Sequence, residues 1–205
     1  MPARNPDLHG MVPDHSTVAL LLLDVVNDLS FPGGERLLRH AVPMARRLAR
    51  LRTRAKRAGI PVIYVNDNYG RWQSDFRRLT ARCRRTGARG KPIVDLLAPA
   101  EDDYFVLKPK HSGFFSTTLD VLLAYLGART LVLTGLAGNI CVLFTAHDAY
   151  MRDYRLVVPA DCVASETRRQ NQQALRVMHT LLKADVTPSI RLRLDRLAGP
   201  DPRTS

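Results

Sequence analysis

A cysteine stands at the junction of two expected elements in the stretch TLVLTGLAGNICVLFTAHDAY, residues 130–150. An apolar run of strand length ends at Thr134, a short loop bracketed by glycines follows, and Cys141 comes directly before a helix-like pattern. A free cysteine is among the most buried residue types, so packing is one interpretation. A thiol at a helix N-terminus instead sits in positive potential, which lowers its pKa and makes it a nucleophile. Asn139 is expected to cap this helix.

Two other reactive side chains also follow apolar runs of strand length. Asp24 follows the run 18–23, and Lys108 follows the run 104–107. In an open parallel sheet the ligand crevice lies beyond the carboxyl ends of the strands. Singly, an Asp after a strand is often a cap and a Lys is usually solvated. An acid, an amine and a thiol at three strand ends together form a set typical of hydrolases.

The elements that must position these residues alternate between apolar and amphipathic stretches, which indicates βαβ units and an α/β fold. The apolar runs are mostly continuous, as expected of parallel strands covered on both faces. We expect strands at 18–23, 62–66, 104–107, 130–134 and 156–158, with a weaker sixth near 185–189. We expect helices at about 35–58, 117–126, 140–152 and 166–183, and a short one around 75–85. Pro43 falls inside the first of these and either kinks it or marks a later start.

The size and composition of the chain are ordinary for a globular protein. Its 205 residues fit one domain, 1–205, with a core at about 16–192 and loosely ordered tails. Three cysteines with no CxxC pair favour a reducing compartment over a disulfide framework. The first residues lack the apolar core of a signal peptide, and the run VALLLLDVV is too short to span a bilayer. We therefore expect a cytoplasmic protein with no membrane partner.

The net charge of +12 raises the question of an acidic partner. The positive charges are mostly arginines spread over helical faces, which are more often solvated than used for binding. A denser basic cluster at 77–91 could be a substrate lid, a subunit contact or an anion site. Aromatic residues do not interleave with it, so we do not expect a nucleic-acid partner.

Three blocks of the sequence resemble a known superfamily. They are LLLDVVNDLSFPGG, VLKPKHSGFFSTTLD and VLTGLAGNICVLFTAHDAYMRDYRLVVPADCVAS, in this order. They resemble the signature blocks of the isochorismatase-like cysteine hydrolases, which include nicotinamidases, N-carbamoylsarcosine amidase, ureidoacrylate and biuret hydrolases, and isochorismatase. The resemblance covers about residues 17–190. It implies a three-layer α/β/α sandwich, Rossmann-like, around a six-stranded parallel sheet.

The resemblance implies a catalytic triad of Asp24, Lys108 and Cys141. The family lysine stands four residues before the Ser of a Ser-small-Phe motif. Here that motif begins at Ser112, so the match is Lys108 and not Lys110.

The resemblance also implies a non-proline cis peptide bond between Leu136 and Ala137, with the backbone amides of Ala137 and Cys141 as the oxyanion hole. In the resulting mechanism Asp24 acts as general base on Cys141. Lys108 holds the carboxylate and offsets the extra negative charge. An ammonium and a helix N-terminus are both expected to favour the thiolate.

Nicotinamidases carry an Asp-x-His pair and a further His after the second strand, which bind a metal. The corresponding stretch here, YVNDNYGRWQSDF, has no histidine, and none occurs from residue 59 to residue 110. We therefore expect no metal and no cofactor.

The substrate pocket is expected to involve side chains near the strand ends. The candidates are Asn27, Asn68, Tyr69, Trp72, His111 and Phe115. Asn27 could instead cap the following turn, and His111 could be a surface residue. Trp72 and Phe115 could equally be core or subunit-contact aromatics.

These observations favour an amidohydrolase that cleaves a C–N bond of a small amide, ureido or lactam compound through a thioester on Cys141. Relatives assemble as dimers or tetramers, so we expect a homodimer or homotetramer. Cys83 and Cys162 lack comparable neighbours and are interpreted as structural or incidental. One alternative is isochorismatase-type vinyl-ether hydrolysis, which Cys141 opposes because relatives with that chemistry typically lack the nucleophile. Another is a non-catalytic anion or nucleic-acid binder on the same fold, motivated by the charge and opposed by the intact triad.

Overall fold

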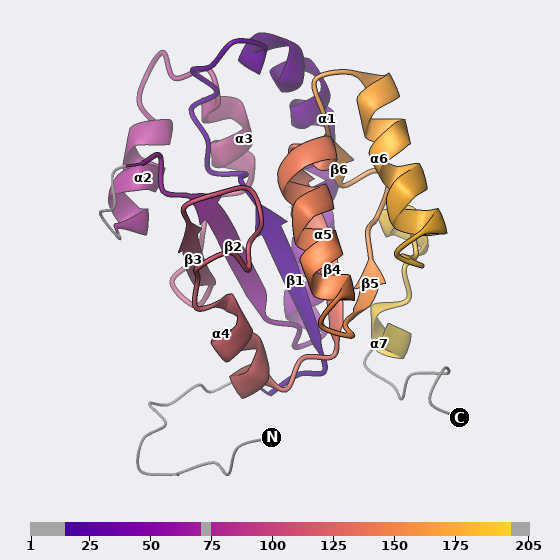
Figure 1. Cartoon of the computed structure of the whole chain (residues 1–205). Helices are drawn as coiled ribbons and strands as arrows, with labels where there is room; N and C mark the ends of the chain where they lie inside the picture. Colours follow the sequence, from indigo (N-terminus) through magenta and orange to yellow (C-terminus); the bar gives the residue numbers. More distant parts are fainter. Residues whose placement is uncertain (1–14, 71–74, 198–205) are drawn as a thin grey trace.

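The core of the protein is a parallel sheet whose strand order differs from the order of the strands in the chain (Figure 1). The computed structural model describes residues 15–70 and 75–197. The strands lie in the order β3-β2-β1-β4-β5, and β6 pairs with β4 beyond the end of β5. Their bounds are β1 Val18–Leu23, β2 Val62–Asp67, β3 Tyr104–Lys108, β4 Thr130–Leu136, β5 Arg155–Val157 and β6 Val163–Ala164.

The five stronger strand predictions are confirmed, and the sixth is wrong. Asp185 forms only an isolated bridge with Val157, and no strand covers 185–189 in the part of the chain that the structure describes. The sixth strand is instead β6. A strand of two residues is too short to leave a periodic pattern in the sequence.

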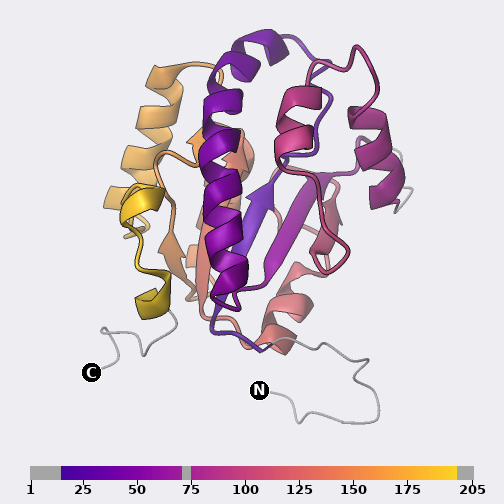
Figure 2. The same cartoon turned by 180° about the vertical axis from the view of Figure 1, so that it is seen from behind.

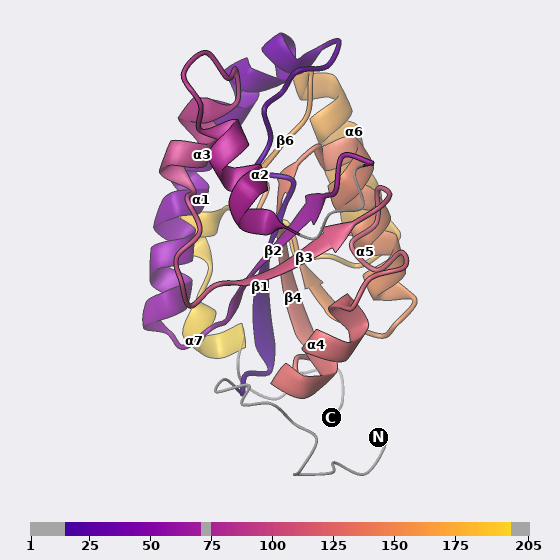
Figure 3. The same cartoon turned by 90° about the vertical axis from the view of Figure 1, so that its left-hand side faces the viewer.

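Helices cover both faces of the sheet, which gives the expected three-layer α/β/α sandwich. Seen along the sheet in Figure 3, α1 and α3 lie on one side and α4 and α5 on the other. The view from behind in Figure 2 shows α1 running across the first face. The bounds are α1 Gly34–Arg57, α2 Phe76–Cys83, α3 Lys91–Leu96, α4 Leu119–Leu126, α5 Leu143–Tyr150, α6 Arg168–Thr180 and α7 Leu194–Leu197.

The alternating residues of β1 divide the core into two halves. Leu20 and Leu22 pack in one cluster with the buried residues of α1, α3 and α7. Leu21 and Leu23 pack in the other cluster with α4, α5 and α6. Successive side chains of a strand point to opposite faces, and both faces are covered here. This is why the first run reads as continuously apolar.

The long helix α1 follows from an apolar stripe at helical spacing. Leu37, Met44, Leu48 and Leu51 are buried along one face of it. The helix runs from Gly34 to Arg57 and contains Pro43, so this proline does not mark its start.

The parallel arrangement gathers the carboxyl ends of the strands at one edge of the sheet. Asp24 follows β1, and the last residues of β2 and β3, Asp67 and Lys108, are register partners. Leu23 at the end of β1 is paired with Gly135 in β4. Residues far apart in the sequence thereby meet above the sheet. No helix within 15–70 and 75–197 has the length and apolarity needed to cross a membrane.

We predict that Gly135→Ala lowers the free energy of unfolding by more than about 3 kcal/mol, because overpacking adds to backbone strain. Gly135 has φ +109°, and a Cβ there would lie 2.1 Å from the carbonyl oxygen of Leu23. Gly59→Ala is the matched control. Gly59 has φ +68° but open space around a Cβ, so its cost is about 1 kcal/mol. Guanidinium chloride unfolding measures both, and equal losses would contradict the packing argument.

Candidate active site

The first residue after β1, Asp24, is held by the backbone of the neighbouring strand. Its N–H donates to the carbonyl of Val65 at 3.0 Å. Its Oδ1 accepts a hydrogen bond of 2.7 Å from the N–H of Asp67. Asp24 has φ +50° and is 4% exposed. The carboxylate is therefore buried and fixed in direction by a backbone donor.

Lys108, at the end of β3, is completely buried. Its Nζ lies 2.9 Å from Asp24 Oδ2, 3.6 Å from Cys141 Sγ and 4.0 Å from Asp67 Oδ2. Burial opposes the charge on this lysine, but its interactions with Asp24, with the Cys141 sulfur and with Asp67 outweigh burial and raise its pKa. Lys108 is therefore held as an ammonium between a carboxylate and a thiol.

Cys141 lies in a π-helical turn, Gly138–Val142, that leads directly into α5. Its side chain is partly exposed, whereas Cys83 and Cys162 are fully buried. Burial and the negative charge of Asp24 raise the pKa of Cys141 to about 12, although Lys108 acts in the opposite direction. The expected lowering of this pKa is wrong for the free protein. Because the resting group is a thiol, a base must take its proton, and Asp24 is placed to do so.

The loop between β4 and the π-helical turn contains a cis peptide bond between Leu136 and Ala137, at the position that the resemblance implied. Asn139 does not cap the following turn, which begins after Ala137 without a side-chain cap. Instead the N–H of Asn139 donates to the hydroxyl of Ser165 at 3.2 Å. The expected capping role of Asn139 is therefore wrong, because the turn starts before it.

A cavity of about 400 Å³ opens beside Cys141. It is lined by Asp24, Asn27, Phe31, Leu37, Asp67, Tyr69, His111, Leu136, Ala137, Asn139, Ile140, Cys141, Glu166 and Gln170. The thiol, a buried carboxylate and the two residues of the cis peptide thus share one cavity. Its volume suits a small molecule.

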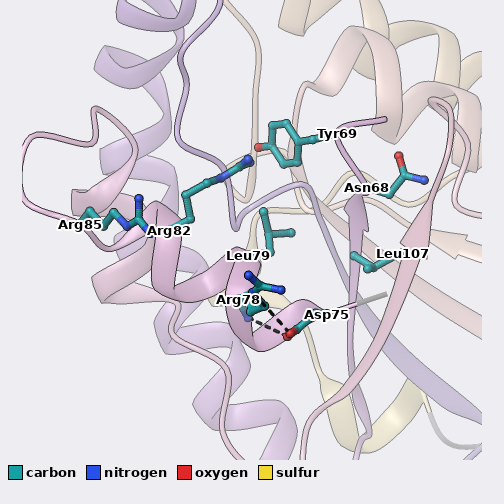
Figure 4. A pocket seen from close by; sticks show the side chains of 8 residues that line it. All are labelled: Asn68, Tyr69, Asp75, Arg78, Leu79, Arg82, Arg85 and Leu107. Atoms are coloured by element: carbon teal, nitrogen blue, oxygen red, sulfur yellow. Dashed lines mark hydrogen bonds and ion pairs between the residues drawn. The ribbon is translucent and has the colours of Figure 1, made fainter. Parts of the chain in front are cut away.

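The predicted pocket residues divide between several places. Asn27, Tyr69 and His111 line the cavity, and the Asn27 side chain also accepts a 2.7 Å hydrogen bond from Leu29 N–H. Asn68 lines a smaller neighbouring pocket instead (Figure 4). Phe115 is not among the residues that line the cavity; it is half exposed and lies against Lys110, and its role in the pocket stays a prediction. Trp72 lies outside the described residues.

Sequence reasoning missed several lining residues, among them Asp67, Glu166 and Gln170. Asp67 ends β2, so its place at a strand end was a usable signal. Glu166 follows β6, which was not recognised, and it is bound to Arg36 at 2.7 Å. Without that strand, nothing in the sequence brings Glu166 to the edge of the sheet.

The described residues contain no group of three or more His, Cys, Asp or Glu side chains arranged to hold a metal ion. His111 lies near Phe144, with ring centroids 5.5 Å apart.

The fold and the site are those of a cysteine hydrolase: a parallel sheet whose strand ends bring a carboxylate, an ammonium and a thiol to one cavity. The Isochorismatase domain model matches residues 18–189. The chain belongs to the isochorismatase family.

Comparisons with known proteins give relatives within this family. The chain is 43% identical over 169 residues to the uncharacterized isochorismatase family protein YaaI of Bacillus subtilis, covering 82% of this chain and 92% of that protein. It is 32% identical over 176 residues to the ureidoacrylate amidohydrolase RutB of Methylorubrum extorquens, covering 72% and 70%. The crystal structure of N-carbamoylsarcosine amidase from Thermoplasma acidophilum matches with a TM-score of 0.67 and 30% identity, covering 86% and 99%.

We predict that Lys108→Met destabilises the protein by about 3–5 kcal/mol, because it leaves the buried Asp24 carboxylate without its ammonium partner. The double variant Asp24→Asn/Lys108→Met removes both charges and should recover part of this loss. Denaturant unfolding of the three proteins tests the coupling. If Lys108→Met is as stable as the wild type, the ion pair between Asp24 and Lys108 does not constrain the fold.

We predict that iodoacetamide labels Cys141 before Cys83 and Cys162, which are fully buried. Because its pKa is raised to about 12, the thiolate fraction of Cys141 grows about tenfold per pH unit below that value. The labelling rate should therefore climb between pH 7 and pH 10 without a plateau. Peptide mass analysis after timed labelling measures this. A plateau below pH 8 would mean that the free protein already carries a thiolate.

Proposed function

We propose that this protein is an amidohydrolase that cleaves the C–N bond of a small amide, ureido or lactam compound through a thioester on Cys141. The observation that carries the proposal is the placement of Lys108 Nζ within 2.9 Å of Asp24 and 3.6 Å of the Cys141 sulfur, beside an open cavity. Two relatives at about 30% identity are named as amidohydrolase and amidase, which supports the same reaction class.

In the proposed first half-reaction, Asp24 takes the proton of the Cys141 thiol as Sγ bonds to the substrate carbonyl carbon. Lys108 stabilises the negative charge that passes from the carboxylate to the sulfur and on to the carbonyl oxygen. The backbone N–H groups of Ala137 and Cys141 would receive that oxyanion, a contribution of about 3–4 kcal/mol in comparable sites. The intermediate collapses when the C–N bond breaks, and the leaving nitrogen takes the proton from Asp24.

In the second half-reaction a water molecule attacks the thioester while Asp24 accepts one of its protons. The tetrahedral intermediate then breaks at the carbon–sulfur bond, which releases the acid, and the proton returns to Cys141. Because its pKa is raised, Cys141 is a thiol in the free protein, so in this cycle Asp24 has to take its proton as the sulfur attacks.

We further propose that the protein acts as a homodimer or homotetramer in a reducing compartment such as the cytoplasm. The exposed apolar side chains of Phe144 and Tyr150 on α5, and of Met151 directly after it, support an interface between subunits. Val121 and Tyr125 on α4 are exposed as well. The three free cysteines support the compartment.

We predict that Cys141→Ala abolishes release of ammonia or amine from any carboxamide, ureido acid or lactam that the wild type cleaves. Asp24→Asn should lower turnover at least about 100-fold, because general base catalysis contributes factors of that size. Cys162→Ala removes a buried thiol that lies beside Ser189 and Asp161 and outside the cavity of Cys141; it is the matched control and should retain turnover. The measurement is a coupled assay for ammonia and amine across a panel of such compounds.

The same variants separate the alternatives. A vinyl-ether hydrolase that uses Asp24 as an acid would keep its activity in Cys141→Ala, a result that would overturn the thioester proposal. A non-catalytic anion binder would show no turnover in the panel. Nucleic-acid binding would fall steeply with rising salt concentration.

A further inference from the structure

A second pocket adjoins the cavity of Cys141 and shares Tyr69 with it. It has a volume of about 140 Å³, and Figure 4 shows its lining: Asn68, Tyr69, Asp75, Arg78, Leu79, Arg82, Arg85 and Leu107. A molecule of liquid water occupies about 30 Å³, so the pocket holds a group of a few heavy atoms. The mechanism proposed above does not use it.

Buried donors in this pocket lack acceptors. The Nε and Nη2 atoms of Arg82 and the hydroxyl of Tyr69 are buried without a hydrogen-bond partner among the residues that the structure describes. In Figure 4 the Arg82 side chain extends from α2 toward the hydroxyl end of Tyr69. Its guanidinium carbon lies 4.5 Å from the centroid of the Tyr69 ring. Buried donors without partners on these two stacked side chains are costly, and an oxygen acceptor bound in the pocket would satisfy them.

The charges favour an anionic acceptor. Three arginines and one carboxylate, Asp75, line the pocket, and the Asp75 side chain is engaged by the N–H of Arg78 at 2.8 Å. Asp28 Oδ2 lies 3.7 Å from Arg82 Nη2, which is an ion pair but too long for a hydrogen bond. Arg82 is 24% exposed, so its guanidinium is partly shielded from water. A carboxylate could accept both of its free N–H groups.

The neighbouring cavity has the opposite character. Its lining includes the carboxylates of Asp24, Asp67 and Glu166 and no arginine or lysine. Asp24 is paired with Lys108 and Glu166 with Arg36, so a negatively charged group beside Cys141 would meet no lining cation, whereas the Arg82 pocket would attract it. Both linings include Tyr69, and together the two pockets suit a molecule with a neutral end and an acidic end.

We propose that Arg82 and Tyr69 bind the carboxylate of an acidic substrate whose neutral amide or ureido end lies at Cys141. This rests on the function proposed above and names its substrate class. Leu79 and Leu107, which line the same pocket, contact the carbon chain next to the carboxylate. Arg82 and Tyr69 set specificity and take no part in bond making.

Binding of butyrate, a monocarboxylate, to the full-length protein, measured by isothermal titration calorimetry, tests the pocket without any need for turnover. Butyrate should bind the wild type, and Arg82→Gln should weaken it about 10- to 100-fold, because a charge-assisted pair is lost. Arg82→Lys should fall between the two, and Tyr69→Phe, which removes only an unpartnered hydroxyl, should weaken binding several-fold. Arg77→Gln, on the same helix and outside this pocket, is the control and should bind like the wild type.

1-Butanol, the neutral analogue, should bind the wild type no better than it binds Arg82→Gln. The proposal is overturned if butyrate does not bind the wild type or binds Arg82→Gln equally well. It is also overturned if inorganic phosphate binds in an Arg82-dependent way and butyrate does not, because the pocket would then be a phosphate site.

A turnover assay links the pocket to Cys141. It compares a ureido acid with the analogue in which an alcohol group replaces the carboxylate. Arg82→Gln should lower kcat/KM for the acid about 10- to 100-fold and leave the alcohol within about twofold. Equal loss for both compounds would overturn a role in carboxylate recognition. If butyrate binds through Arg82 but no amide or ureido compound is cleaved, the hydrolase proposal fails while the carboxylate pocket stands.

Discussion

The buried ion pair between Asp24 and Lys108 is the constraint on which the site depends. A buried charge without a partner is costly, so β1 and β3 must end where Lys108 Nζ reaches Asp24 Oδ2, which lies 2.9 Å away. The parallel register of β1, β2 and β3 provides this, and the backbone N–H of Asp67 fixes the direction of the carboxylate. The same pair also acts on the pKa of Cys141, because the carboxylate raises the pKa of the thiol and the ammonium lowers it.

These opposing effects explain how a thiol can rest inactive and still be a nucleophile. Burial and Asp24 keep the proton on Cys141 in the free protein. The carboxylate that raises the pKa is also the group that can remove the proton. In the proposed mechanism, a substrate that gives the sulfur a carbon to attack makes that transfer favourable, and Lys108 balances the charge throughout. The reactivity therefore belongs to the group of three and not to the cysteine alone.

Residues placed by strand ends were predictable from the sequence, because parallel strands end at one edge whatever their order in the chain. Asp24 and Lys108 belong to this class. Glu166 does not, because the two-residue strand before it leaves no pattern. The cap expected at Asn139 and the lowered pKa expected at Cys141 both assumed an ordinary helix start. Packing between distant segments decides where the turn begins and how deeply the thiol is buried beside Asp24. Local sequence does not encode that packing.

Hydroxylamine trapping tests the central claim most directly, once a substrate has been found. If Cys141 forms a thioester, hydroxylamine competes with water for it, and part of the product appears as the hydroxamate. An acid-quenched sample should then carry the substrate acyl group on the peptide that contains Cys141. Turnover that yields the free acid alone, with no hydroxamate and no mass added to that peptide, would contradict the account.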